Sequence, residues 1–350
     1  MGVPTPLREL TTLRLGGPPR RLVETGTEAE LVAAVREADA GEPVLVLAGG
    51  SNVVVADEGF PGTVVRVLSR GIERREADGR TVLTAQAGEP WEPFVEQCVD
   101  EGLAGVESLT GIPGSIGATP IQNVGAYGQE VAEIVTQIRV LDRERDVVED
   151  LPAAAAGFAY RSSAFKRTPG RWVVLAVTFA LERRALSGPI EYAELARTLD
   201  VRTGEGAPLA EVRDAVLRLR RGKGMVVDPE DPDSVSAGSF FTNPVLEAQA
   251  FAELEERAGD GARPPRFPEP DGRVKTSAAW LIERAGFARG YGNPDGIAIS
   301  RKHTLALVNR GHGTTAELVA LAREIAAGVR ERFGVELVPE PVLVGHAWPG

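Results

Sequence analysis

The sequence predicts an α+β protein with more than one domain. Its 350 residues exceed the roughly 100–200 residues of a typical domain. Strand-like patterns with few helices run through residues 72–181, and helical patterns recur after residue 185. These shifts divide the chain into residues 1–70, 71–184 and 185–334, with closing strands in residues 335–350.

The first section contains a helix and short apolar strands. Thr27 followed by Glu30 matches a capping box, which predicts a helix over residues 28–38. An apolar run at residues 44–48 predicts a buried strand that breaks at Gly49-Gly50-Ser51-Asn52 and resumes at residues 53–55, and residues 63–67 predict another strand. No amphipathic helix follows this turn, so it does not match a Rossmann glycine loop.

The later sections alternate strands with helices. We expect strands at residues 81–87, 136–141, 147–148 and 172–181, and helices at residues 91–102, 208–221 and 276–285. Thr314 and Glu317 form a second capping box before another amphipathic helix. Residues 257–272 are rich in Pro, Gly and charge and predict a loop, and residues 335–338 and 342–344 predict closing strands.

Composition argues against several classes of protein. The net charge of −11 argues against nucleic-acid binding, and no apolar run reaches the roughly 18 residues of a membrane span. The N-terminal residues lack the apolar core of a signal peptide, so we expect a cytoplasmic protein. The single cysteine, Cys98, is expected to pack in the core, and the three scattered histidines predict no metal site.

The most informative stretch covers residues 111–128 and reads GIPGSIGATPIQNVGAYG. Its five glycines allow positive φ and close ligand approach, while Pro113 and Pro120 prevent a regular helix or central strand. Such a stiff loop exposes backbone N–H groups that can hold an anion, above all a pyrophosphate. The alternative interpretation is a surface loop without a ligand.

Three further stretches combine residues suited to catalysis. They are YRSSAFK at residues 160–166, SAGSFFTNP at residues 236–244, and the Pro-Glu pair at residues 339–340. Arg161 in the first stretch has a planar fork that suits bidentate binding of a carboxylate. The alternatives are a solvated basic turn, a bend that enters a strand, and an exposed glutamate.

Taken together and in this order, the motifs resemble the UDP-N-acetylenolpyruvoylglucosamine reductases (MurB), in their longer subclass. The resemblance implies a PCMH-type fold, with two FAD-binding subdomains in residues 1–70 and 71–184 and a substrate domain in residues 185–334. It implies that the closing strands return toward the FAD module. It also implies non-covalent FAD, NADPH as co-substrate, and reduction of a UDP-linked enolpyruvyl ether during peptidoglycan precursor synthesis. The expected partner is a small nucleotide sugar, with no nucleic acid and no membrane.

The resemblance also implies roles for individual residues. Arg161 would stabilise charge on the substrate carboxylate, Ser239 would protonate the substrate carbon, and Glu340 would stabilise the enolic intermediate. Glu336 is a rival for Glu340, and Pro341 departs from the P-E-V that members of the family often have. The implied cofactor residues are Gly49, Gly50, Ser51, Asn52, Gly111, Pro113, Gly114, Gly117, Gln122, Asn123, Gly125, Ala126 and Tyr127. The implied substrate residues are Tyr160, Tyr192, Lys223, Asn243 and Lys275.

Two other functions fit parts of this pattern. Another PCMH-type flavoenzyme, such as a carbohydrate oxidase, would share the fold, but no His/Cys pair is placed for a covalent flavin link. A nucleotide-sugar binding protein that has lost catalysis would keep the glycine loop. Lys223 could also bind NADPH phosphates, or it could simply compensate charge at the end of its helix.

Overall fold

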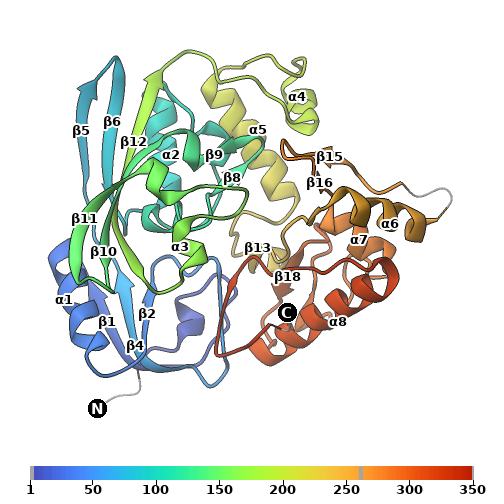
Figure 1. Cartoon of the computed structure of the whole chain (residues 1–350), viewed down its shortest axis with the longest axis horizontal. Coiled ribbons are helices and arrows are strands. Elements are labelled where there is room, and N and C mark those ends of the chain that lie inside the picture. Colours follow the sequence, from blue (N-terminus) through green and yellow to red (C-terminus); the bar gives the residue numbers. More distant parts are fainter. Residues whose placement is uncertain (1–3, 260–262, 349–350) are drawn as a thin grey trace. The chain divides into compact units, whose positions relative to one another are not determined.

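The computed structural model describes residues 4–259 and 263–348, which form two compact units (Figure 1). Unit 1 contains mainly residues 19–50 and 61–226, and unit 2 contains residues 5–18, 51–60 and the chain from residue 227 onward. The predicted boundaries after residues 70 and 184 fall inside unit 1, and the one after residue 334 falls inside unit 2. They remain predictions about how each unit is subdivided.

The N-terminal part of unit 1 is a three-stranded sheet with one helix. Its elements are β1 (Pro19–Thr25), α1 (Glu28–Asp39), β2 (Val44–Leu47) and β4 (Phe60–Val67). The strand order is β1-β4-β2, with β2 parallel to β4. The predicted capping box starts α1, because the Glu30 N–H donates to the Thr27 hydroxyl and the Thr27 N–H donates to the Glu30 carboxylate. The buried Leu31 and Val35 join α1 to the core of this part of the unit.

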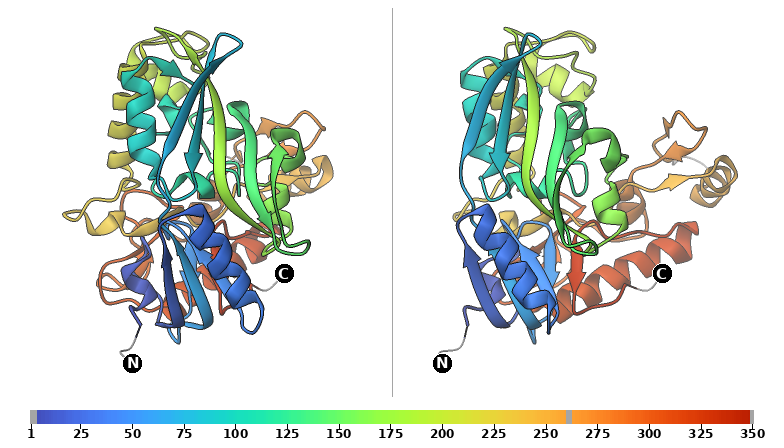
Figure 2. Two further views of the ribbon diagram at one scale, coloured as in Figure 1. Left: turned by 90° about the vertical axis from the view of Figure 1, so that its left-hand side faces the viewer. Right: turned by 60° about the vertical axis from the view of Figure 1, so that its left-hand side comes forward.

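A larger antiparallel sheet forms the rest of the scaffold of unit 1. Its main strands are β5 (Ile72–Ala77), β6 (Arg80–Gln86), β10 (Val135–Asp142), β11 (Val147–Pro152) and β12 (Trp172–Arg183), in the order β11-β10-β12-β6-β5. Both views in Figure 2 show these long strands side by side. The helices are α2 (Trp91–Asp100) and α5 (Leu209–Gly222), and the shorter elements are β7 (Leu103–Ala104), β8 (Gly125–Ala126), β9 (Gln129–Glu130), α3 (Ala164–Arg167) and α4 (Ala193–Leu199).

Aromatic packing holds α2 against this sheet. The rings of Trp91 and Phe94 on α2 meet Phe179 of β12, with ring centroids between 5.0 and 6.1 Å apart. The strands and helices predicted for this section are confirmed. Helix α2 ends at Asp100, before the predicted residue 102, because Gly102 takes a left-handed φ of 73°.

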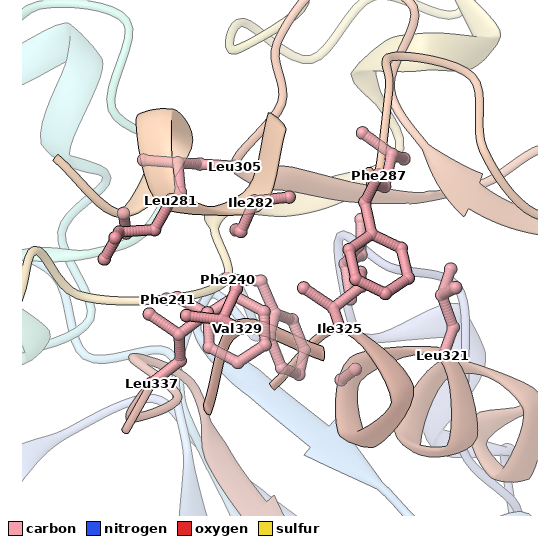
Figure 3. Close-up of a cluster of buried hydrophobic side chains, with 14 of the residues drawn as sticks. Phe240, Phe241, Leu281, Ile282, Phe287, Leu305, Leu321, Ile325, Val329 and Leu337 are labelled. Carbon is pink, nitrogen blue, oxygen red and sulfur yellow. The ribbon is translucent and has the colours of Figure 1, made fainter. Parts of the chain in front are cut away.

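Among the described residues, unit 2 packs three α-helices with two three-stranded sheets and one two-stranded sheet. The elements are β13 (Ser236–Ser239), β14 (Val245–Leu246), α6 (Ala248–Ala258), β15 (Phe267–Pro268), β16 (Val274–Lys275), α7 (Ala278–Arg284), β17 (Ile297–Ile299), β18 (Ala306–Asn309) and α8 (Thr315–Phe333). The sheet orders are β13-β18-β17 and β14-β16-β15, both antiparallel. The side chains of Phe240, Phe241, Ile325 and Leu337 gather in the core of this unit (Figure 3).

The start of α8 is stabilised from two directions. The predicted capping box of Thr314 and Glu317 is present. The carboxylate of Asp57 also accepts hydrogen bonds from the N–H groups of Thr315 and Ala316, at 2.8 and 2.9 Å. The first four N–H groups of a helix have no partner within the helix, and Asp57 accepts hydrogen bonds from two of them in α8. Because Asp57 is distant in the sequence, this contact ties its segment to α8. Every helix among the described residues is too short or too polar to span a bilayer.

The strand predicted at residues 53–55 is confirmed but has an unexpected partner, and the strand predicted at residues 335–338 is wrong. Residues 53–55 form β3 (Val53–Val55), but this strand does not continue the sheet of β2; it pairs in parallel with β19 (Val342–Val344). The break at residues 49–52 therefore marks the passage from unit 1 to unit 2. Residues 335–338 form no regular strand, and only an isolated bridge joins Phe241 to Pro339. Pro339 and Pro341 supply no N–H for a ladder, which limits regular pairing directly after these residues.

Candidate functional site

Backbone hydrogen bonds attach the glycine loop of residues 111–128 to the rest of unit 1. The Trp91 N–H donates to the Gly114 carbonyl at 3.1 Å, and the Gly117 N–H donates to the Ala87 carbonyl at 2.9 Å. A Cβ at Gly117 would lie only 2.6 Å from the Cβ of Ala87. Glycine is therefore required for this approach, and the loop is pinned against residues 87–91.

The two glycine-rich stretches predicted to hold the cofactor meet in unit 1. A Cβ at Gly49 would lie 2.8 Å from the Cα of Gly114, so only glycine allows these backbones to come so close. Gly50 follows with a left-handed φ of 59°. Ser51 and Asn52, predicted as part of the same cofactor site, belong to unit 2.

Sequence reasoning missed one polar group in this loop. Ser115 is buried, and its Oγ atom has no hydrogen-bond partner among the described residues. An orphaned buried hydroxyl is uncommon in proteins, and a phosphate oxygen would satisfy it. Side-chain-free backbone at Gly49, Gly114 and Gly117 beside this hydroxyl fits a cofactor that carries a diphosphate. The signal in the sequence was a serine between two glycines of the loop.

We predict that Gly49→Ala reduces the FAD content of the purified protein. The added methyl group would collide with the backbone of Gly114, which cannot move aside by rotating a side chain. The flavin-to-protein absorbance ratio should fall at least about threefold, in line with a loss of roughly 1 kcal/mol in binding. Gly41→Ala is the matched control, because a Cβ there meets nothing within 4 Å. Equal flavin content in the two variants would show that the two backbones do not form the cofactor site.

The second half of the loop is held in an unusual backbone conformation. Tyr127 and Gly128 have φ values of 50° and 90° at the turn between β8 and β9, as a type I′ turn requires. Asn123 is also left-handed, with φ of 47°. Its side chain donates to Glu130 at 2.6 Å and to the Ala159 carbonyl at 3.2 Å, and accepts from the Ala132 N–H at 3.1 Å. These bonds hold the loop, and the predicted contact of Asn123 with the cofactor remains a prediction.

The other predicted cofactor residues of this loop are also placed by the structure. Gly111 is left-handed, with φ of 70°, and Gly125 is buried. Pro113, Gln122 and Ala126 are half-buried.

Arg161 is anchored on the same loop. Its guanidinium donates to the carbonyls of Gly125 at 2.6 Å and Asn123 at 3.3 Å, and its Cζ lies 5.5 Å from the ring centroid of Tyr160. Arg161 has φ of 50° within a tight turn closed by two hydrogen bonds between Ala159 and Ser162. Such strain, of about 1–3 kcal/mol, persists where the surroundings enforce it, and it gathers at functional sites.

Two predicted substrate residues and one cofactor residue form a second cluster in unit 1. The rings of Tyr127 and Tyr192 meet edge to face, with centroids 5.3 Å apart. The Nζ of Lys223 lies 5.7 Å from the ring centroid of Tyr127 and 2.5 Å from a carboxylate oxygen of Glu194. Burial raises the pKa of the Tyr127 hydroxyl. Burial alone would lower the pKa of Lys223, but the hydrogen bond to Glu194 raises it above its ordinary value.

A buried arginine in the same unit also escaped the sequence reasoning. Arg220 donates to the carbonyls of Gly111 and Met225 at 3.2 and 3.1 Å, and its Nε has no partner among the described residues. Burial lowers the pKa of its guanidinium to about 10. Arg220 lies one helical turn after Val216, so a cation on the apolar face of α5 was the available signal. It places a cation directly behind the glycine loop.

In unit 2, the structure brings Ser239 and Glu340 onto neighbouring backbone segments. The Glu340 N–H donates to the Phe240 carbonyl at 2.8 Å, and the Phe240 N–H donates to the Leu305 carbonyl at 2.7 Å. Strand β13 bulges before Ser239, where Gly238 takes φ of 73°. The side-chain amide of Asn52 donates to the Glu340 carbonyl at 3.4 Å. Glu336, the rival candidate, is exposed on the surface.

The remaining predicted substrate residues lie close together in unit 2. Lys275 of β16 pairs with Val245 of β14, and its Nζ lies 2.6 Å from a carboxylate oxygen of Glu269. The side-chain oxygen of Asn243 accepts from the Ala278 N–H at 3.0 Å, at the start of α7. Arg161 belongs to unit 1, whereas Ser239, Glu340, Asn243 and Lys275 belong to unit 2.

The sequence predicts that Cys98 packs in the core and that the histidines form no metal site. Cys98 is buried, and burial raises the pKa of its thiol to about 12, which confirms a packing role. Among the described residues, no group of His, Cys, Asp and Glu side chains has the arrangement of a metal site.

Comparison with known proteins gives consistent matches along the whole chain. Residues 19–150 match the FAD binding domain family, and residues 230–344 match the C-terminal domain of UDP-N-acetylenolpyruvoylglucosamine reductase. The UDP-N-acetylenolpyruvoylglucosamine reductase of Thermobifida fusca is 57% identical over 346 residues, 97% of each chain. The protein of that name from Streptomyces coelicolor is 55% identical over 98% of this chain and 90% of its own. The crystal structure of the Thermus caldophilus reductase is similar, with a TM-score of 0.65, 25% identity and 97% coverage of both chains.

Proposed function

The chain belongs to the family of UDP-N-acetylenolpyruvoylglucosamine reductases, and from this premise we propose which of its residues carry out that reaction. The protein is an FAD-dependent oxidoreductase that uses NADPH to reduce UDP-N-acetylglucosamine enolpyruvate to UDP-N-acetylmuramate, a step in peptidoglycan precursor synthesis. The structural observation that best supports our assignment is the backbone hydrogen bond from Glu340 to Phe240, the residue that follows Ser239. We place the reaction in the cytoplasm, where NADPH is made and consumed.

The glycine loop would hold the diphosphate of FAD. Gly114 and Ser115 would contact it through backbone N–H groups and the unpartnered Ser115 hydroxyl, and Gly49 leaves room for the backbone of Gly114. Bound FAD would supply the two-electron relay between NADPH and the vinyl carbon of the substrate. The charged Arg220 behind Gly111 would add a positive potential to this part of the site.

Arg161 would stabilise the negative charge that develops on the substrate when the vinyl group is reduced. That charge spreads into the adjacent carboxylate, whose two oxygens match the fork of a guanidinium. The carbonyls of Gly125 and Asn123 fix the orientation of Arg161 before the substrate arrives. A cation that needs no reorganisation during the reaction stabilises the transition state most effectively.

Ser239 would then protonate the carbon that bears the ether oxygen. A serine hydroxyl is a weak acid, so it can serve only a strongly basic, carbanion-like carbon. The bulge at Gly238 displaces Ser239 from a regular ladder position, and the backbone bond at Phe240 sets Glu340 next to it. Glu340 would stabilise the enolic intermediate from this position.

Four aromatic and cationic side chains together with an asparagine would hold the rest of the nucleotide sugar. They are Tyr160, Tyr192, Lys223, Asn243 and Lys275. Lys223 and Lys275 are both paired with glutamates, so each can exchange a carboxylate for a phosphate oxygen. The partner is thus a small nucleotide sugar.

Product analysis tests this proposal. The purified protein, NADPH and UDP-N-acetylglucosamine enolpyruvate should give one product that is heavier by two hydrogens, with one NADPH consumed per product. Oxygen uptake with free sugars and no NADPH would instead identify a carbohydrate oxidase. Binding of the nucleotide sugar without NADPH consumption would identify a protein that has lost catalysis.

A further inference from the structure

We propose that Glu194 controls how tightly the protein binds a nucleotide diphosphate, because its carboxylate competes with the diphosphate for Lys223. This inference rests on the proposed function, in which Lys223 contacts the diphosphate of the sugar nucleotide. It adds a residue that opposes binding, whereas the other proposed substrate residues favour it.

The geometry places Glu194 directly on Lys223. The Nζ of Lys223 lies 2.5 Å from Oε2 of Glu194, and the two side chains are 29% and 36% exposed. Lys223 ends α5, and Glu194 lies in the first turn of α4, just after Tyr192. The Nζ also faces the ring of Tyr127 at 5.7 Å, and that ring contacts Tyr192. The Glu194 carboxylate and the Tyr127 ring therefore both contact the ammonium group of Lys223.

The ion pair is not needed to hold α4 on α5. An apolar cluster already joins the two helices; it contains Ile190, Leu195, Ala196, Ala207, Val212, Ala215 and Val216. Partly exposed ion pairs contribute little to stability, about 0–1 kcal/mol. A carboxylate that contributes so little to folding can be removed without unfolding this part of the unit.

The charges define the competition. A diphosphate that contacts Lys223 must displace Glu194 or lie beside it, and both groups are negative. The partial burial of the pair keeps solvent from screening this repulsion fully. The hydrogen bond to Glu194 raises the pKa of Lys223, so the lysine stays charged at neutral pH and the competition operates there.

Calorimetric titration of the FAD-bound protein with UDP tests the proposal. Glu194→Gln should bind UDP about two- to fivefold more tightly than the wild type, which corresponds to losing a competing ion pair of about 0.4–1 kcal/mol. Uridine, which lacks phosphate, should bind equally to both proteins. Glu191→Gln is the matched control, because it removes the same charge from an exposed position before α4 and should leave UDP affinity unchanged. In a Lys223→Met background, Glu194→Gln should no longer tighten UDP binding.

Other outcomes would overturn the proposal. If Glu194→Gln weakens UDP binding, or changes UDP and uridine alike, Glu194 is a structural residue and not a competitor. If NADP⁺ binds more tightly and UDP does not, the diphosphate at Lys223 is that of the dinucleotide. If the wild-type protein does not bind UDP, the proposed substrate is contradicted as well. If turnover is normal and Glu194→Gln leaves UDP affinity unchanged, only this inference is contradicted.

Discussion

Ser239→Ala should leave the reduction of the flavin by NADPH intact and slow its reoxidation by the enolpyruvyl sugar at least about 100-fold, the typical contribution of a general acid. The reason is that, in the proposed mechanism, Ser239 acts only on the carbon that receives a proton after the electrons arrive. The side chain is half-buried on β13, where alanine fits without a clash. Stopped-flow absorbance of the flavin band measures the two half-reactions separately.

Thr242→Ala provides a control from the same stretch of sequence. Its hydroxyl donates a long hydrogen bond of 3.4 Å to the Val338 carbonyl, and it lies three residues beyond Ser239. Both half-reactions of this variant should stay close to wild type. An equal loss in both half-reactions of Ser239→Ala would mean that the serine supports the structure and does not donate the proton.

Arg161→Lys should lower turnover about 100-fold while flavin content and flavin reduction by NADPH stay normal. Lysine keeps the positive charge but loses the fork that donates to two loop carbonyls and that, in our proposal, binds two carboxylate oxygens. Removing one preorganised donor from a developing anion costs about 10²–10³-fold in rate. Steady-state kinetics at saturating substrate, with flavin absorbance as a check on loading, measures the effect.

The neighbouring Arg167 gives a matched comparison for Arg161. Its exposed guanidinium donates to the Ser162 hydroxyl and the Gly157 carbonyl, so it belongs to the same turn. Arg167→Lys should lose less than about twofold in turnover, in keeping with the small effects of exposed polar contacts. Similar losses in the two variants would show that the fold of the turn matters and that Arg161 has no special role toward the substrate.

Local signals predicted most elements of the fold. Both capping boxes, at Thr27 and Thr314, start the expected helices because the bonds involved are only three residues apart. The pairing partner of residues 53–55 could not be predicted from such local signals. Their apolar pattern predicts a strand, but the partner, β19, lies at the other end of the chain. Pairing partners are set by tertiary structure, which a local pattern does not contain.

Candidate site residues could be predicted where the backbone geometry requires glycine. They could not be predicted where their importance depends on burial and on contacts that only the fold reveals. Gly49 and Gly114 were found because close backbone approach needs glycine. Ser115, Arg220 and Glu194 were missed, because a serine, an arginine on a helix and a glutamate after a tyrosine are ordinary until their surroundings are known. Ser115 gains its meaning from an unpartnered buried hydroxyl, and Glu194 from its contact with Lys223.

The stepwise absorption spectrum of the purified protein under anaerobic conditions tests the central claim most directly. We expect a flavin spectrum that NADPH bleaches and that one equivalent of UDP-N-acetylglucosamine enolpyruvate restores. A flavin that NADPH bleaches and only oxygen restores would contradict it, as would a protein that binds the nucleotide sugar without any flavin.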